Sequence, residues 1–149
     1  MNNENKVDLV VAGLIISDNK VLLIHHRKLD RWIPPGGHID PNETPDGALR
    51  REIKEELGME IEILNRNDIA LGGNIVEQLA VPFYANVHSV GDHDHCCFFY
   101  LCKPKTETME INERELKDFK WFTLEQLNDE RVPSDVRNIS KKAFESLNK

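Results

Sequence analysis

The sequence predicts a mixed α/β (α+β) fold, in which helices cover both faces of a mixed β-sheet. Three observations lead to this fold class. Several short runs are rich in Val, Ile and Leu, as strands are. One segment carries helix signals at both of its ends. The C-terminal segment shows the spacing of an amphipathic helix, with a single apolar face.

The predicted strands begin at the N-terminal end of the chain. Residues 7–16 form a nearly continuous apolar run and predict a buried strand. A turn at residues 18–20 separates it from a second strand that starts at residues 21–24, so the two are expected to form a hairpin. Residues 28–40 are expected to be a loop. Further strands are expected at residues 59–64, 79–90, 96–102 and 119–122, with a short one at 69–71.

The clearest helix is predicted over residues 45–57. Thr44 can cap its N-terminus, and Pro45 suits the first helical position. Gly58 stands where a left-handed residue ends a helix. The apolar stripe of this helix repeats every four residues and consists of Leu49, Ile53 and Leu57.

Two more helices are predicted near the C-terminus. Thr123 can cap a short helix that runs through Leu127, and Ser134 can cap a final amphipathic helix. The residues expected to face inward on the final helix are Val136, Ile139, Ala143, Phe144 and Leu147.

Length and charge restrict the functions that the chain can have. Its 149 residues are expected to form a single domain, residues 1–149. A formal net charge of −7 disfavours long nucleic acid and anionic membranes as partners. Three cysteines, two of them adjacent, indicate free thiols in a reducing compartment, and no apolar run is long enough to span a membrane. We therefore expect a cytoplasmic protein.

Carboxylates gather on the helix at residues 45–57. Glu52, Glu55 and Glu56 stand at positions i, i+3 and i+4 and are therefore neighbours on one side. At about 5.5 Å and an effective dielectric constant of about 20, each pair repels by roughly 3 kcal/mol. Arg51 offsets part of this repulsion. Hard carboxylate oxygens favour Mg²⁺ or Mn²⁺, and the loop at Gly37 can add a carbonyl oxygen. The alternative is a solvated acidic face.

A longer pattern extends around this helix. Gly37 is followed after five residues by Glu43, and after seven more by the run Arg-Glu-Ile-Lys-Glu-Glu-Leu-Gly-Met at residues 51–59. This pattern resembles the signature of the Nudix hydrolases, G-x5-E-x7-R-E-U-x-E-E-x-G-U, where U is a bulky aliphatic residue. All nine specified positions match, over 23 of the 149 residues. The resemblance implies the Nudix-type α/β/α sandwich.

The resemblance also implies a chemistry and residue roles. Nudix enzymes use Mg²⁺ or Mn²⁺ to hydrolyse a nucleoside diphosphate linked to another group, by water attack on phosphorus. By this resemblance, Glu52 and Glu56 look like metal ligands, Glu55 like a further ligand or the base, and Arg51 like the residue that orients the glutamates. The Gly37 carbonyl group resembles another ligand. Glu43 resembles a supporting residue or an additional ligand, and the general base stays open.

Candidate substrate-binding residues lie outside the signature. Trp32 can stack on a base or hold the loop to the core. His25 and His26 are adjacent in a strand and should face opposite sides, and His26 is our candidate for the cleft. In related enzymes a late loop supplies another carboxylate. Glu113 is our candidate for this role, and the alternatives are Glu115, Asp92, Asp94 and a merely solvated loop.

The histidines and cysteines near residue 95 invite a zinc hypothesis. His88, His93, His95, Cys96 and Cys97 lack the C-x₂-C spacing of structural zinc sites. A hairpin turn at residues 91–95 followed by a strand, with one of the two thiols facing the core, is the favoured interpretation.

Two functions remain open at this stage. The first is a catalytic Nudix hydrolase that acts on a small nucleotide, for which a nucleoside triphosphate is the preferred candidate. The second is a non-catalytic Nudix-fold nucleotide-binding or sensor domain. Non-catalytic relatives are expected to lose one or more glutamates of the signature, and this chain keeps all of them. Dimers are common in the family, so a homodimer also stays open.

Overall fold

The computed structural model describes residues 6–106 and 108–148. The elements in these residues are, in chain order, β1 (Val7–Ser17), β2 (Lys20–His26), β3 (Arg31–Ile33), β4 (Gly36–His38), α1 (Pro45–Leu57), β5 (Ile61–Ile63), β6 (Tyr84–Ser89), β7 (Asp94–Pro104), β8 (Leu116–Phe122), the single-turn 3₁₀ helix η1 (Gln126–Asn128) and α2 (Ser134–Leu147). Neither α-helix of this part of the chain combines the length and hydropathy that a bilayer span needs.

The strands form one mixed sheet with β1 near its centre. β1 pairs in parallel with β7, from Val7 opposite Asp94 to Ile15 opposite Cys102. The other pairs of named strands are antiparallel: β2 and β4 both pair with β1, β3 and β8 with β2, and β5 and β6 with β7. The predicted β1–β2 hairpin and the mixed sheet are therefore confirmed.

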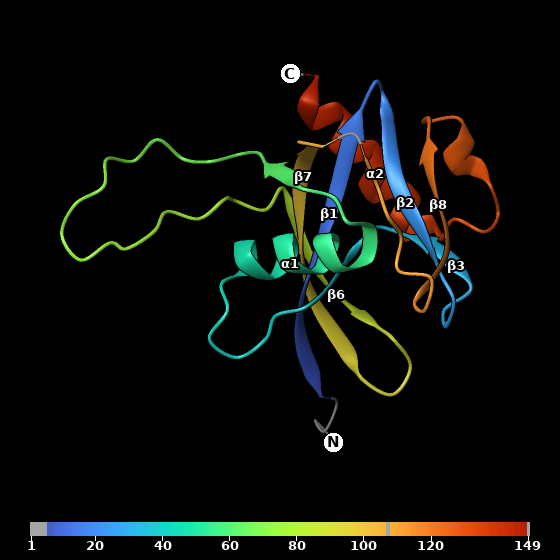
Figure 1. The fold of residues 1–149 in the computed structure, drawn as a ribbon, viewed down its shortest axis with the longest axis horizontal. Coiled ribbons are helices and arrows are strands. Elements are labelled where there is room, and N and C mark those ends of the chain that lie inside the picture. The colour runs from blue at the N-terminus through green and yellow to red at the C-terminus, as the bar shows by residue number, and fades with distance from the viewer. Residues whose placement is uncertain (1–5, 107, 149) are drawn as a thin grey trace.

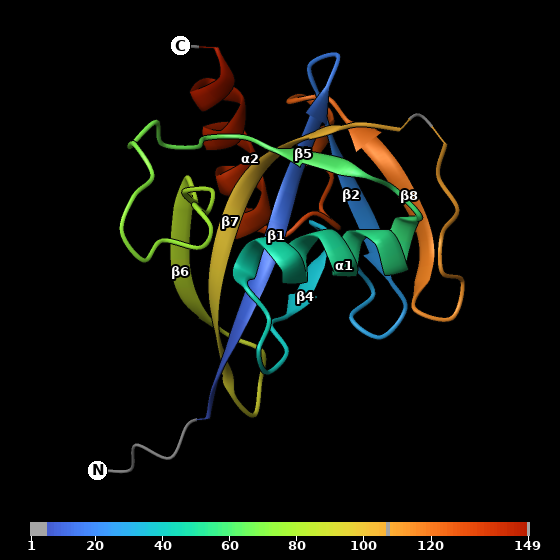
Figure 2. The same cartoon turned by 60° about the vertical axis from the view of Figure 1, so that its left-hand side comes forward.

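The two α-helices lie on opposite faces of this sheet, as predicted (Figures 1 and 2). Alternation along β1 divides the core between them. Val11 and Ile15 point to the α1 face, where they join the helix stripe of Leu49, Ile53 and Leu57. Side chains of the other parity point to the α2 face, where they meet Val136, Ile139 and Ala143. Phe144 and Leu147 pack against this second core while partly exposed.

Helix α1 begins and ends as its sequence predicts. The Thr44 side chain accepts a hydrogen bond of 3.0 Å from the backbone N–H of Gly47, and Pro45 occupies the first helical position. Gly58 ends the helix with φ of 63° and donates its N–H to the carbonyl oxygen of Lys54. Both caps fix the position of the glutamates relative to the sheet.

Several predicted boundaries were wrong. The expected loop at residues 28–40 contains β3 and β4, because these short segments pair with β2 and β1. Residues 69–71 form no strand, and β6 begins only at residue 84. Ser134 is the first residue of α2 instead of its cap. β7 and β8 both start earlier than expected, because their neighbours in the sheet extend the pairing.

Candidate active site

Strand β4 and helix α1 meet at Gly37 and Glu52. A methyl group on Gly37 would overlap the Glu52 carboxylate, so a larger residue there would push that side chain out of its position. Gly37 pairs with Val11 of β1 and therefore lies on the α1 face of the sheet. The sheet, the glycine turn and the helix thus hold one carboxylate of the signature directly against the β4 backbone.

Arg51 joins the acidic residues of the signature. Its Nε donates to Glu43 Oε2 at 2.7 Å, and its Nη1 donates to both Glu52 Oε1 at 2.7 Å and Glu55 Oε1 at 3.1 Å. It also donates to the carbonyl oxygen of His38 at 3.0 Å. These bonds, first among them the one to Glu43, raise the pKa of Arg51 above its ordinary value, so the guanidinium stays charged. Arg51 therefore contacts three of the four signature glutamates, and its role in orienting them stays a prediction.

Both carboxylate oxygens of Glu43 accept hydrogen bonds from other residues of the protein. Arg51 contacts both of them, and the backbone N–H of Asp40 donates to Oε1 at 2.9 Å. The hydrogen bonds from Arg51 are the main cause that lowers the pKa of Glu43 to about 2. Of the two predicted roles of Glu43, this geometry favours support of Arg51 over direct metal ligation.

Glu56 is the most buried glutamate of the signature, with 5% of its surface exposed. Its Oε1 accepts a hydrogen bond of 3.0 Å from the backbone N–H of Gly36. Burial is the main cause that raises the pKa of Glu56 to about 8, and the negative charges of Glu52, Glu115 and Glu55 add to it. A buried carboxyl group among other carboxylates is expected to release its proton when a cation arrives.

The other two glutamates differ in exposure. Glu52 is half-buried, and burial raises its pKa although Arg51 opposes the shift. Glu55 lies at the surface, with 51% of its side chain exposed, in contact with Arg51. One guanidinium therefore faces more carboxylates than it can neutralise. This set of hard oxygen donors with excess negative charge fits a Mg²⁺ or Mn²⁺ site.

Glu115 is the late-loop carboxylate that the electrostatics connects to this site. Its charge raises the pKa of both Glu52 and Glu56. The sequence predicts Glu113 as the late-loop carboxylate, with Glu115 among the alternatives. Glu113 is exposed, and its backbone carbonyl oxygen accepts a hydrogen bond of 2.6 Å from Arg27 Nε. A substrate-binding role for Glu113 stays a prediction.

The remaining substrate candidates lie on β2 and β3. Trp32 is 6% exposed, and its ring packs 5.0 Å from that of His25 and 5.2 Å from that of Phe122. This packing supports a role in holding the loop to the core. His25 is buried, whereas His26 is partly exposed and accepts a bond from the N–H of Lys28. Contact of Trp32 or His26 with a substrate stays a prediction.

Comparison with known proteins places this site in a family. A family model described as NUDIX domain matches residues 7–144. A nucleoside triphosphatase, NudI, from Enterobacter sp. (strain 638) is 34% identical over 123 residues, which cover 76% of this chain and 81% of that protein. An 8-oxo-dGTP diphosphatase from Buchnera aphidicola is 41% identical over 56 residues, which cover 35% of this chain and 43% of that protein.

A solved structure shows the same fold. The structure of a Nudix family hydrolase from Clostridium perfringens has a TM-score of 0.81 and 29% sequence identity to this chain. The match covers 94% of this chain and 97% of that one.

Proposed function

Because this chain belongs to the Nudix hydrolase family, we propose that it hydrolyses the pyrophosphate linkage of a small nucleoside diphosphate derivative in a reaction that needs Mg²⁺ or Mn²⁺. A nucleoside triphosphate or related nucleotide is the preferred substrate. The printed functions of the Enterobacter and Buchnera relatives support this choice. The observation that carries the proposal is the complete set of glutamates gathered on Arg51 and on the β4 backbone.

Each side chain of the site has a distinct task in this proposal. Glu52, Glu55 and Glu56, together with the Gly37 carbonyl oxygen, would hold the divalent ions. Bound ions neutralise the phosphate charge and lower the pKa of an attacking water. Arg51 orients the carboxylates, and Glu43 anchors Arg51 through two bonds. Glu55, which is exposed, and Glu56, which is held at the Gly36 N–H, are the candidates for the group that accepts the proton of the water.

A panel of nucleotides tests the proposal directly. The purified protein is incubated with each nucleotide in Mg²⁺, in Mn²⁺ and in EDTA, and released phosphate and pyrophosphate are measured. We expect turnover of at least one nucleotide with metal and none with EDTA. The Glu56→Gln variant should lose several orders of magnitude in rate, because it removes a charged oxygen at the centre of the site. Full turnover in metal-free buffer would contradict the proposed metal-dependent mechanism.

The same panel separates the enzyme from a sensor domain. A sensor binds a nucleotide in calorimetry and releases no phosphate or pyrophosphate with any metal. The intact glutamate set argues for the enzyme, because a non-catalytic relative is expected to have lost one or more of these residues.

We also propose that the chain acts as a single domain, residues 1–149, in the cytoplasm and as a homodimer. Its three cysteines are free thiols, which suits a reducing compartment. An extended arm at residues 65–80 protrudes from the molecule (Figure 1). Several of its apolar side chains are more than half exposed, and a second copy of the chain could cover them; they are Ile69, Leu71, Ile75 and Val76.

The base of this arm is fixed. Arg66 and Ala80 form a β-bridge across it. The buried carboxylate of Asp46, in the first turn of α1, accepts a hydrogen bond of 3.1 Å from the Ala80 N–H and lies 3.4 Å from the Arg66 guanidinium. Any contact made by the arm is therefore connected to the helix that carries the glutamates.

A further inference from the structure

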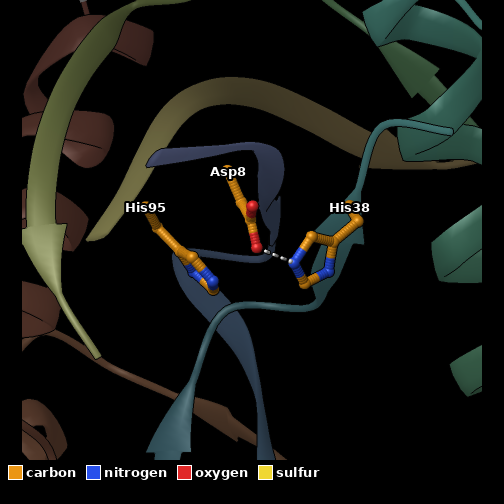
Figure 3. Close-up of side chains that lie close together, drawn as sticks. All are labelled: Asp8, His38 and His95. Carbon is orange, nitrogen blue, oxygen red and sulfur yellow. Dashed lines mark hydrogen bonds and ion pairs between the residues drawn. The ribbon is translucent and has the colours of Figure 1, made fainter. Parts of the chain in front are cut away.

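A second group of metal-ligating side chains lies away from the glutamates. Asp8 on β1, His38 on β4 and His95 on β7 point toward one another (Figure 3). Each offers one ligand atom, and these three atoms all lie within 4.8 Å of one another. His88 and His93 stand beside them, with ring centroids 5.7 and 5.1 Å from that of His95. We call Asp8, His38, His93 and His95 the histidine cluster.

Strand pairing places the histidine cluster on the opposite face of the sheet from the glutamates. Asp8 pairs with His95, and His38 pairs with Val10, whose side chain belongs to the α2-side core. The next residue back along β4, Gly37, pairs with Val11 and faces α1. Adjacent residues of β4 therefore serve two different faces. None of the residues of the histidine cluster occupies a specified position of the Nudix signature, since His38 stands at an unspecified position directly after Gly37.

The separations within the cluster match those of metal ligands. Asp8 Oδ2 lies 3.1 Å from His38 Nε2 and 3.4 Å from His93 Nε2. His93 Nε2 lies 3.3 Å from His95 Nε2. Ligands about 2.0–2.1 Å from a tetrahedral zinc ion are about 3.3 Å from one another. The ligand atoms of Asp8, His38 and His95 are thus mutually close, and His93 contacts two of these three residues.

The surroundings of the cluster also resemble a built site. His93 uses its Nδ1 to contact Asp92 at 2.7 Å, which turns its Nε2 toward the cluster. A carboxylate on the far nitrogen is the usual partner of a metal-bound histidine. The other oxygen of Asp8 lies 3.6 Å from Lys6, so Oδ2 stays with the histidines. His38 is 56% exposed at its side chain, which leaves an entry path for an ion.

Hydrogen bonds and ion pairs connect the cluster: Asp8 contacts His38 and His93, and His93 contacts His95. The rings of His38, His88 and His93 all lie beside that of His95. Burial lowers the pKa of His95, and positive charge on His38, His88 and His93 would lower it further. The lowered pKa favours the neutral form of His95, which is the form that binds metals.

We propose that Asp8, His38 and His95, with His93 as the fourth ligand, bind one borderline-soft divalent ion such as Zn²⁺. This site is separate from the Mg²⁺ or Mn²⁺ site at the glutamates. Imidazole nitrogens select zinc and its neighbours in the transition series, whereas the carboxylate oxygens of α1 select hard ions. The nearby thiol of Cys97 takes no part, because it is buried and burial raises its pKa to about 12.

Calorimetry with Zn²⁺ tests the site. The titration is run on the full chain in millimolar Mg²⁺, which occupies the glutamates. We expect one Zn²⁺ per chain for the unchanged protein and for Glu56→Gln. His38→Asn and His95→Asn should each weaken binding at least tenfold, and the matched control His26→Asn should not. The proposal would be overturned if the unchanged protein bound no Zn²⁺, or if the His38 and His95 variants bound it as tightly as the unchanged protein.

Cobalt gives a second readout that does not depend on enzymatic activity. Co²⁺ in the unchanged protein should give the visible absorption of a tetrahedral site, and this absorption should be lost in His95→Asn. Circular dichroism of the variant shows whether it is folded, and His38→Asn, at an exposed position, serves if it is not. A sulfur-to-cobalt charge-transfer band that disappears in Cys96→Ser would place the ion on the thiols and contradict the assignment.

Discussion

Gly37 presents only a hydrogen atom to the Glu52 carboxylate. We expect Gly37→Ala to lower metal-dependent hydrolysis about 100-fold or more, because displacement of a positioned group by about 1 Å costs about that much. Steady-state rates on the best nucleotide of the panel measure the effect. Gly72→Ala is the control, since a methyl group there meets nothing within 4 Å. Activity of Gly37→Ala within twofold of the unchanged protein would contradict the proposed position of Glu52.

Glu56 makes stability depend on pH when no metal is present. Its pKa rises from 4.5 to about 8 on folding, so the folded state favours the protonated form. Its contribution to stability is complete below 4.5 and is lost as the pH rises through about 8. In EDTA, the melting temperature of Glu56→Gln minus that of the unchanged protein should therefore increase as the pH rises from 4.5 to about 8.

Thermal melts at a series of pH values measure this difference. Because other titrating groups affect both proteins alike, their contributions cancel in the difference between the two melting temperatures. Added Mg²⁺ should reduce it, because a cation stabilises the ionised carboxylate. A difference that stays constant from pH 4.5 to 8 would show that Glu56 is not held in its protonated form.

At the scale of the elements, helix α1 depends on its N-cap. Thr44→Ala should lower the free energy of unfolding by about 1 kcal/mol, because the Gly47 N–H loses its acceptor. Thr44→Ser keeps the hydroxyl group and should change stability little. Urea unfolding of both variants measures the effect. Equal stability of the two variants would mean that the cap contributes nothing to the helix.

The sequence predicts α1 well because its signals are local. Thr44, Pro45 and Gly58 act on their own neighbours, and the signature glutamates keep fixed spacing on a helix. Strands β3 and β4 escape prediction because three-residue segments take their structure from partners elsewhere in the chain. The link between Glu115 and the signature glutamates likewise depends on how the late loop folds back toward α1.

The histidine cluster shows the same limit more sharply. His93 and His95 are close in sequence, and the residues around them lack the C-x₂-C spacing of structural zinc sites. Asp8 and His38 join them only because β1 pairs with both β7 and β4. A pattern of residues along the chain does not contain this sheet pairing, so the four residues could be grouped only from the structure.

At the scale of the whole molecule, the arm at residues 65–80 predicts association. Val76 is 97% exposed and Ile69 is 65% exposed. Exposing several large apolar side chains on one arm is unfavourable in water and indicates an interaction surface. We expect a dimer in sedimentation velocity at micromolar concentration, and a monomer for the double variant Ile69→Asp with Val76→Asp. Leu124→Asp, at an exposed apolar residue off the arm, should remain a dimer. A monomeric unchanged protein would refute a role for the arm in dimerisation.

The parallel pairing of β1 with β7 also has a consequence for how the chain folds. Val7 pairs with Asp94, and Ile15 pairs with Cys102, so more than half of the chain must be made before β1 and β7 can pair. Pairing over such sequence distance is slow. During synthesis, β1 therefore leaves the ribosome before β7, as an apolar strand with an unpaired edge, and is a segment that chaperones would bind.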